Sequence, residues 1–306
     1  MQLNKRKLRS YKEFLMILPF LAVVAIFSYF PLYGWVYAFH DYRPPFPITK
    51  DTFVGLKWFE TIISNPTRTK NIIRVLRNTF AMSGISLAFS WFPMVFAIFL
   101  NEIKCEPYKK FVQTVTTRPN FISWVLVYSI AFNLFGSFGA VNTVLQELGL
   151  IDTPIAFMKS SEHVWFTQWL WLTWKNAGWA AIMYLAAITG IDQQMYEAAD
   201  IDGAKKMQKI WYITLPSIRP TILTLFILEI GHIMTAGFDQ IFNLYSPAVY
   251  KVADVLDTYT YRQGIEDQNY SYATAAGLFQ NIVGFILVIL SNWISKKLTD
   301  GEEGLW

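Results

Sequence analysis

The chain has 306 residues, of which 54% are hydrophobic and 16% charged, and its net charge is only +4. Ordinary soluble domains carry about 25% charged residues, so this composition excludes a water-soluble enzyme, a disordered chain and a nucleic-acid-binding protein. The lone cysteine, Cys105, cannot close an internal disulfide and lacks neighbours at the spacing of a zinc site. A polytopic membrane protein is the class that remains.

Six apolar stretches are each long enough for a membrane span, which needs about 20 helical residues. The first, 14–39, is uncharged and follows a basic N-terminus at 1–13, so we expect an uncleaved anchor whose N-terminus is cytoplasmic. The later spans are predicted at about 79–101, 119–136, 164–190, 220–238 and 273–294. We therefore predict an all-α polytopic membrane protein whose six-helix transmembrane domain covers 14–298, followed by a cytoplasmic tail at 299–306.

Three local features modify these spans. Pro93 is expected to kink the second span, which neighbouring helices tolerate in a membrane. Gly136 is expected to end the third helix near Phe135. The basic stretch from Arg68 to Arg77 precedes the second span, and it could form an amphipathic helix at the membrane interface.

The distribution of basic residues predicts the orientation. Lys and Arg are about twice as dense in the proposed inner segments, which include 101–112 and 191–219, as in the proposed outer loops. Cytoplasmic loops carry this excess in membrane proteins. Both termini are therefore expected on the cytoplasmic side.

The inner loop at 191–219 is too long for a bare connector. It contains QQMYEAADIDGAKKMQKIWYITLPSIRP, which predicts two short helices that change direction at Gly203. The second is expected to run from Lys205 to Ile213 and to end before Pro216. A small helix face with nearby carboxylates suits a groove on a soluble partner, and a solvated helical loop is the alternative.

The same loop carries a family resemblance. The order Glu197-Ala198-Ala199, Gly203 and Leu215-Pro216 is similar at each fixed position to the EAA motif of ABC importer permeases. The stretches AGFDQIFNLYSPAVYKVADVLDTYTYRQG and YSYATAAGLFQNIVGFILVILSNWISKKL resemble the MalF/UgpA-like carbohydrate permeases of the LplB type. The resemblance implies a type I ABC importer permease fold in the bacterial cytoplasmic membrane and the import of oligosaccharides.

The resemblance also implies partners and a coupling site. The partners would be a second homologous permease, two copies of a cytoplasmic ABC ATPase, an extracytoplasmic solute-binding protein and the lipid bilayer. No GxxxxGK[ST] phosphate loop occurs in the chain, so ATP and Mg would be held by the ATPase, and no cofactor is expected here. The residues implied to couple to the ATPase are Glu197, Ala198, Ala199, Asp202, Gly203, Leu215 and Pro216.

A sugar path needs aromatic faces together with amides and carboxylates for the hydroxyl groups. Intramembrane charges usually face a cavity or a partner, so Lys175 is expected either to pair with Glu229 or to face an acidic sugar. The outer loop 243–270 is the first candidate for contact with the binding protein. The candidate path residues are Asn133, Trp171, Lys175, Asn176, Glu229, His232, Asp239, Gln240 and Asn281.

Two other functions were weighed against an importer. A stand-alone secondary carrier or channel for a small polar solute also fits six spans with interior charges. An intramembrane enzyme would need a positioned acid, base or nucleophile, but His40, His163 and His232 lie in separate segments. We therefore expect no catalytic residues in this chain.

Overall fold

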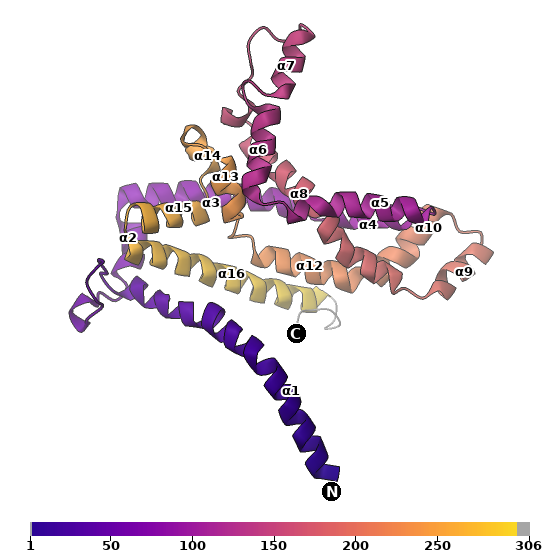
Figure 1. Ribbon diagram of the computed structural model, residues 1–306, viewed down its shortest axis with the longest axis horizontal. Helices are drawn as coiled ribbons and strands as arrows, with labels where there is room; N and C mark the ends of the chain where they lie inside the picture. The colour runs from indigo at the N-terminus through magenta and orange to yellow at the C-terminus, as the bar shows by residue number, and fades with distance from the viewer. Residues whose placement is uncertain (1, 299–306) are drawn as a thin grey trace. The chain divides into compact units, whose positions relative to one another are not determined.

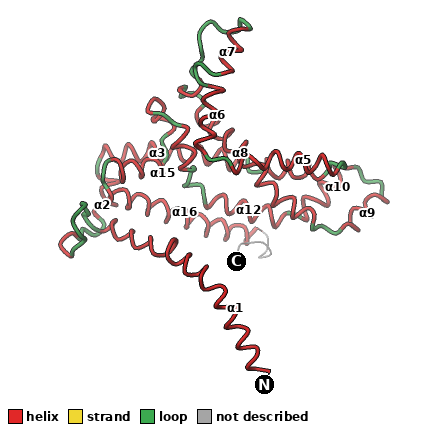
Figure 2. Tube along the Cα trace, viewed as in Figure 1, coloured by secondary structure: helices red, strands yellow, loops and turns green. Residues whose placement is uncertain are grey.

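A computed structural model describes residues 2–298 of the chain. Helices and connecting loops make up this described part (Figure 2), and its only β-type pairing is an isolated antiparallel bridge between His40 and Phe53. The predicted all-α class is thus confirmed for the described residues. The predicted tail at 299–306 lies outside them.

The chain divides into two compact units, and the first comprises residues 2–65 and 260–279. It begins with one long helical stretch that changes from α-helix to π-helix to 3-10 helix. Ala38 packs with Ala275 and Leu278, and the Trp58 indole donates to the carbonyl of His40 at 2.9 Å. Its elements are α1 (Gln2–Val24), η1 (Ala25–Tyr29), η2 (Phe30–Phe39), η3 (Lys50–Thr52), α2 (Lys57–Ser64), η8 (Arg262–Glu266) and the start of α16 (Tyr270–Leu298).

The second unit comprises residues 66–259 and 280–298, and it contains most of the helices that Figure 1 labels between α3 and α15 together with the C-terminal part of α16. Its first half contains α3 (Pro66–Ala88), α4 (Phe92–Asn101), α5 (Glu106–Thr117), η4 (Arg118–Phe121), α6 (Trp124–Phe135), α7 (Ala140–Glu147), η5 (Phe157–Lys159) and α8 (Val164–Thr189). Its second half contains α9 (Gln193–Ile201), α10 (Lys206–Lys209), η6 (Ile210–Thr214), α11 (Leu215–Ser217), α12 (Arg219–Gly231), α13 (Phe238–Leu244), η7 (Pro247–Val249), α14 (Tyr250–Ala253) and α15 (Leu256–Tyr261).

Helix α8 is the centre of the second unit. It packs against α3, α4, α5 and α12, and it has 26 residues. Small and aliphatic side chains from α4 and α8 form the main apolar core, with Ala97 and Ala181 almost fully buried. This packing arranges the neighbouring helices around α8.

Four helical stretches in the described residues are long and apolar enough to cross a membrane, and a bent pair of helices makes a fifth if it counts as one span. The bent pair, Lys206–Ser217 with Arg219–Gly231, turns by 63°. The prediction of six spans is therefore not confirmed by this criterion. Helix α8 is long enough but falls outside the count because its Trp and amide side chains lower its apolar character. The four stretches are Glu13–Phe39, Pro66–Asn101, Trp124–Glu147 and Tyr270–Lys297.

Several predicted boundaries differ from the structure. The second helical stretch begins at Pro66, and it breaks between Ala88 and Phe92 so that Pro93 lies in the first turn of α4. A proline is tolerated there because the first turn has no intrahelical acceptor for its missing N–H. The third helix does end at Phe135, as predicted.

The predicted fifth span, 220–238, is wrong at its C-terminal end because α12 stops at Gly231. A Cβ atom on Gly231 would lie 2.6 Å from Cγ2 of Val288, so this glycine permits close approach of α12 to α16. The following turn closes at Gly237, whose φ of +86° suits glycine. The chain then starts the separate helix α13.

Candidate functional site: an exposed loop and a cavity beside α8

The loop between α8 and α12 begins with a capped helix. Asp192 caps α9, since its side-chain oxygen accepts from the backbone N–H of Gln194 at 2.9 Å. At the other end the N–H of Ala204 donates to the carbonyl of Ala199 at 2.9 Å, and Gly203 has a φ of +74°. No atom would lie within 4 Å of a Cβ on Gly203, so the backbone conformation, and not the available space, favours glycine.

The second helix of the loop does not end before Pro216, contrary to the prediction. It continues from α10 through the π-helical turn η6 into α11, where Pro216 lies in the first turn. Proline has no N–H to donate, but it lies just after the π-helical turn, where the regular α-helical hydrogen-bond pattern is already interrupted, so the helical path continues. Ile210 packs into the core of α4 and α8, whereas Met207 and Trp211 are exposed.

Polar contacts hold the two arms of this loop together. The Tyr196 hydroxyl lies 2.9 Å from Oγ1 of Thr214, and Lys209 forms an ion pair with Asp200. Lys206 joins the loop to the end of α4 through a 3.1 Å ion pair with Glu102. Exposed ion pairs contribute little stability, but together these contacts define how the loop is presented.

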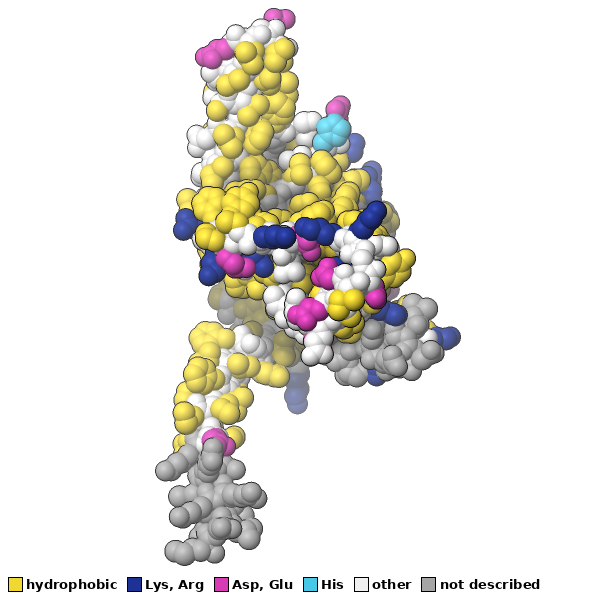
Figure 3. Space-filling model, turned by 90° about the vertical axis from the view of Figure 1, so that its right-hand side faces the viewer, with side chains coloured by type: hydrophobic (Ala, Val, Ile, Leu, Met, Phe, Trp, Pro, Cys, Tyr) yellow, Lys and Arg dark blue, Asp and Glu magenta, His cyan; other side chains and the backbone are white. Residues whose placement is uncertain are grey.

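The tip of the loop combines carboxylates with exposed apolar side chains. Ile201 is 88% exposed and Tyr212 is 79% exposed, beside the exposed carboxylates of α9. Figure 3 shows Lys, carboxylate and apolar side chains gathered at this end of the second unit. Of the residues implied to couple to an ATPase, Ala199 and Leu215 are half-buried and the others are exposed: Glu197, Ala198, Asp202, Gly203 and Pro216.

Lys175 lies on α8 and is only 7% exposed. Its Nζ donates to the carbonyl of Asn120 at 2.6 Å and to that of Pro119 at 3.3 Å, and it lies 5.5 Å from the centre of the Trp124 ring. The expected ion pair with Glu229 does not form among the described residues. Two carbonyls of η4 take the place of a carboxylate; that of Pro119 also accepts from the N–H of Ile122 at 3.1 Å.

The residues of α8 that follow Lys175 contact the chain near Asn120 as well. Nδ2 of Asn120 donates to Oδ1 of Asn176 at 3.1 Å. A Cβ on Gly178 would overlap the carbonyl group of Thr116 and would lie 2.8 Å from the N atom of Thr117. Helix α8 is therefore in direct backbone contact with the junction between α5 and η4.

A cavity of about 340 Å³ lies between α8, α12 and the break that separates α3 from α4. We call it the central cavity. Phe89 and Trp169 form one part of its wall, with their ring centroids 4.4 Å apart. Its volume is at the lower end of the range for small-molecule sites. Polar side chains that line it include Ser86, Thr173, Asn176, Tyr184, Glu229 and His232.

Glu229 and His232 both line this cavity, although His232 lies just beyond the last residue of α12. Nδ1 of His232 lies 2.8 Å from the carbonyl oxygen of Leu228. A carbonyl oxygen only accepts hydrogen bonds, so Nδ1 carries a proton. In the neutral ring Nε2 is then a hydrogen-bond acceptor.

The other predicted path residues lie elsewhere. Gln240 is buried, and its side-chain amide donates to the backbone and side-chain oxygens of Gln168, at 2.6 and 2.9 Å. Trp171 lines a second, apolar cavity of about 610 Å³, where it packs against Phe135 and Trp174. Asn133, Asp239 and Asn281 are exposed and line neither of these two cavities.

Sequence reasoning missed the aromatic and hydroxyl side chains of the central cavity. Phe89, Trp169 and Tyr184 lie in apolar helices, where they are hard to distinguish from lipid-facing or packed residues. The break before Pro93 was the available sign, because an interrupted helix leaves room beside its neighbour.

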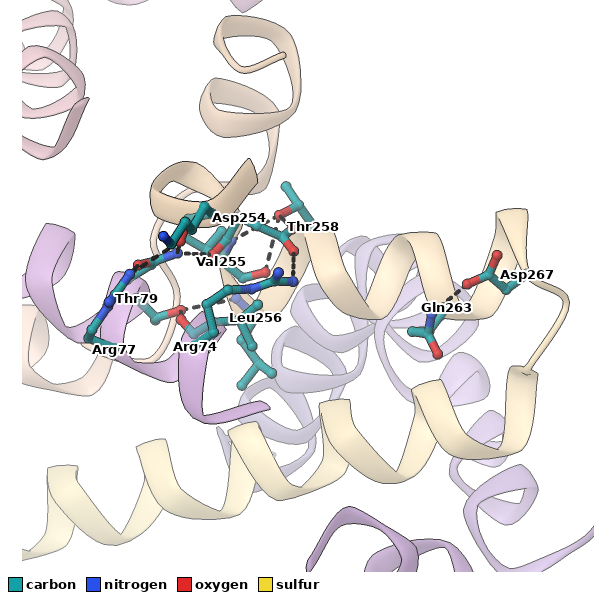
Figure 4. Close-up of polar contacts among 12 residues, drawn as sticks. Arg74, Arg77, Thr79, Asp254, Val255, Leu256, Thr258, Gln263 and Asp267 are labelled. Carbon is teal, nitrogen blue, oxygen red and sulfur yellow. Dashed lines mark hydrogen bonds and ion pairs between the residues drawn. The ribbon is translucent and has the colours of Figure 1, made fainter. Parts of the chain in front are cut away.

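The segment from Asp254 to Thr258 is held to α3 by polar contacts, as Figure 4 shows. Asp254 is fully buried: it accepts from Oγ1 of Thr258 at 2.9 Å and forms a 3.4 Å ion pair with Arg74. Asn78 donates to the backbone carbonyl of Asp254 at 2.9 Å. The basic stretch before the second span is thus part of α3, and its Arg74 contacts protein.

Asp257 belongs to the same segment as Asp254 and Thr258. Its Oδ1 accepts from Nε2 of Gln280 at 2.7 Å, and the same nitrogen donates to the carbonyl of Met234 at 2.8 Å. Burial raises the pKa of the Asp257 carboxyl above its usual value, against the opposite effect of hydrogen bonds from Gln280 and the backbone of Ala236. This carboxyl joins the segment to the turn that follows α12. Among the described residues, no group of three His, Cys, Asp or Glu side chains could hold a metal ion.

Comparison with known proteins identifies relatives of this chain. The chain is 40% identical to the polygalacturonan/rhamnogalacturonan transport system permease protein YteP of Bacillus subtilis strain 168, over 96% of this chain and 89% of that protein. It is 38% identical to protein LplB of the same organism, over 96% of this chain and 90% of that protein.

A solved structure has the same fold. It is a bacterial alginate ABC transporter in complex with a periplasmic protein that carries an alginate pentasaccharide. One of its chains is 35% identical to this chain with a TM-score of 0.84, and the match covers 98% of this chain and 99% of that chain. The type I ABC importer permease fold implied by the sequence resemblance is therefore confirmed.

The family model that describes the inner membrane component of binding-protein-dependent transport systems matches residues 106–300. This range covers more than half of the chain, including α8, the exposed loop and α12. The chain therefore belongs to the family of binding-protein-dependent transport system inner membrane components.

Proposed function

We propose that this chain is one transmembrane permease subunit of an ATP-driven, binding-protein-dependent importer of oligosaccharides. It would form half of the translocation path, and a second homologous permease would form the other half. Two copies of a cytoplasmic ABC ATPase would bind and hydrolyse ATP with Mg, and an extracytoplasmic binding protein would deliver the sugar. The chain itself would hold no cofactor and catalyse no reaction.

The proposal includes a topology. We propose six spans in the bacterial cytoplasmic membrane, with α8 and α12 as the fourth and fifth, and with both termini in the cytoplasm. The N-terminal segment 1–13 and the tail 299–306 would be cytoplasmic. The density of Lys and Arg in the proposed inner segments supports this orientation.

The single observation that carries the proposal is the exposed loop between α8 and α12. It presents apolar side chains and carboxylates at its tip, and such a surface on a helical turn suits a groove on a soluble partner. The loop is also joined to the core, because Ile210, Leu215 and Ile218 pack with α4 and α8. A displacement of the loop would therefore be transmitted to the helices that line the central cavity.

Transport would then follow from movement of this loop. Closure of the two ATPases on ATP would pull the loop of each permease, and the helices around the central cavity would rearrange to receive the sugar from outside. ATP hydrolysis would reset the complex. Oligosaccharides are supported as the substrate class by relatives whose names specify polygalacturonan, rhamnogalacturonan and alginate.

Reconstitution tests the proposed function directly. The complex is purified with its ATPase and second permease, placed in proteoliposomes, and assayed for uptake of a radiolabelled oligosaccharide delivered by the binding protein. The expected result is uptake that requires ATP and the binding protein. A stand-alone carrier would instead transport with an ion gradient and without ATP, and that result would refute the proposal.

The exposed loop can be tested with a matched pair of glycines. Gly203 and Gly149 have φ values of +74° and +68°, and neither would bring a Cβ within 4 Å of another atom. Proline requires a φ near −65°, so Gly203→Pro distorts the tip of the loop and is expected to abolish co-purification of the ATPase. Gly149→Pro places the same strain after α7 and should leave ATPase binding unchanged.

A charge reversal gives an independent test of the same surface. Glu197→Lys changes an exposed side chain of α9, so the protein should insert normally but lose the ATPase. Membrane insertion is checked by size-exclusion chromatography in detergent. ATPase recovery at the wild-type level with both Gly203→Pro and Glu197→Lys would contradict the assignment of the loop.

A further inference from the structure

We propose that Glu229 acts as a charge filter in the central cavity and makes this permease favour neutral oligosaccharides over chains that carry uronate carboxylates. The inference rests on the proposed function, because it assigns a substrate class to the same path. The names of two relatives specify the acidic polymers polygalacturonan and alginate, so the inference predicts a different substrate preference for this chain.

The charges around the cavity carry the first part of the argument. Glu229 is a lining residue, and no Lys or Arg side chain lines the cavity within the part of the chain that the structure describes. The basic residue nearest in sequence to the lining, Lys175, is held by the carbonyls of Pro119 and Asn120 and is not a lining residue. A uronate that enters would therefore meet a carboxylate with no cation from this chain to compensate.

Two of the hydrogen-bonding groups favour the same conclusion, whereas the hydroxyl groups of Ser86, Thr173 and Tyr184 could donate to either kind of sugar. The Glu229 carboxylate only accepts, and the bond from Nδ1 of His232 to Leu228 leaves Nε2 as an acceptor in the neutral ring. These acceptors match sugar hydroxyl groups, which can donate. A uronate carboxylate only accepts, so it could not bond to either group.

The remaining lining groups complete a site for an uncharged sugar. Oδ1 of Asn176 is occupied by Asn120, which leaves its Nδ2 to donate to a ring or hydroxyl oxygen. Phe89 and Trp169 supply a flat apolar wall against which the C–H face of a sugar ring can pack. Donors, acceptors and apolar surface are thus all available without a positive charge.

The expected discrimination follows from the interaction between like charges. A carboxylate a few ångströms from Glu229 in a partly hydrated cavity would weaken binding about tenfold for each uronate that occupies the cavity. Glu229→Gln removes the charge, keeps the side-chain shape and adds a donor. It should therefore raise the affinity for a uronate chain about tenfold and change that for a neutral chain by less than about threefold.

The test uses one sugar in two charge states. Tetragalacturonate and its fully methyl-esterified form share a backbone and differ in net charge. Their affinities for the detergent-purified complex, without the binding protein, are measured by saturation-transfer NMR for wild type, Glu229→Gln and Glu147→Gln. Glu147 is an exposed carboxylate on α7 that lines neither cavity, so its variant controls for net charge.

Wild type and Glu147→Gln should bind the ester at least about tenfold more tightly than the acid, and Glu229→Gln should reduce this ratio to about threefold or less. An unchanged ratio in Glu229→Gln, tighter binding of the acid by wild type, or no binding of either sugar would overturn the inference. ATP-driven uptake is measured in parallel. Failure of uptake despite the expected binding ratios would refute the importer function and leave the charge filter standing.

Discussion

The contact between Gly178 and the end of α5 gives a sharp prediction about stability. A Cβ at residue 178 would overlap the carbonyl group of Thr116 and would lie 2.8 Å from the N atom of Thr117, where ordinary contacts begin at 3.4 Å. In Gly178→Ala the backbones of α8 and α5 must therefore move apart by roughly half an ångström or more. Overpacking of this kind costs about 1–3 kcal/mol.

The same displacement would strain the polar contacts beside it. Nζ of Lys175 lies 2.6 Å from the carbonyl oxygen of Asn120, and the Asn120–Asn176 bond is 3.1 Å long. Alanine gains about 1 kcal/mol over glycine in a helix interior, which offsets part of the cost. We expect a net loss of about 1–2 kcal/mol in the free energy of unfolding for Gly178→Ala.

Gly84 provides the matched control, because it also lies inside a long helix but its Cβ would have no atom within 4 Å. Gly84→Ala should be neutral or stabilising by up to about 1 kcal/mol. Thermal unfolding of the purified chain in one detergent measures both variants. For a chain of this size, about 1 kcal/mol corresponds to a shift of roughly 2–4 °C or less in the melting temperature. The reasoning is refuted if Gly178→Ala melts at or above the temperature of Gly84→Ala.

Two further predictions concern buried charged groups. Lys175→Met should lower the free energy of unfolding by about 2–4 kcal/mol, because the carbonyls of Pro119 and Asn120 lose their charged donor; an unchanged melting temperature in detergent would contradict this. Asp257→Asn should change the pH dependence of stability: burial raises the pKa of Asp257 in the folded state, so its contribution is present at low pH and is lost as the pH rises through that raised pKa. The melting temperature should therefore fall less steeply with rising pH, between about pH 4 and pH 8, for the variant than for wild type. Parallel pH profiles of the two proteins would exclude this role.

Much of the fold could be predicted from apolar length alone. The first and last long helices follow from uncharged runs, because a bilayer requires such runs whatever surrounds them. The turn at Gly203 could be anticipated as well, since glycine adopts a positive φ at little cost. These features depend on local sequence, and local sequence is what a single chain provides.

The helix boundaries that were not predicted involve tertiary contacts. The glycine at the C-terminal end of α12, Gly231, packs against Val288, which lies more than 50 residues later in the chain. The early start of α3 depends on polar contacts such as that of Arg74 with Asp254. No periodicity within α12 or α3 contains this information, because the partners are distant in sequence.

The candidate site shows the same division. Glu229 and His232 could be expected close together because they are three residues apart, although His232 lies beyond the last residue of α12. An ion pair between Lys175 and Glu229 was expected because their charges are opposite. Lys175 instead donates to backbone carbonyls of η4. Backbone acceptors are invisible in a list of side chains, so this outcome required the structure.

The central position of α8 has a consequence for attempts to redesign the specificity of this permease. One edge of the helix lines the central cavity through Asn176, and the adjacent positions Lys175 and Gly178 brace the junction of α5 and η4. A new residue on α8 would therefore alter ligand preference and folding at once. Glu229 borders the cavity from α12 and not from α8, so libraries for altered cargo are best concentrated at that position.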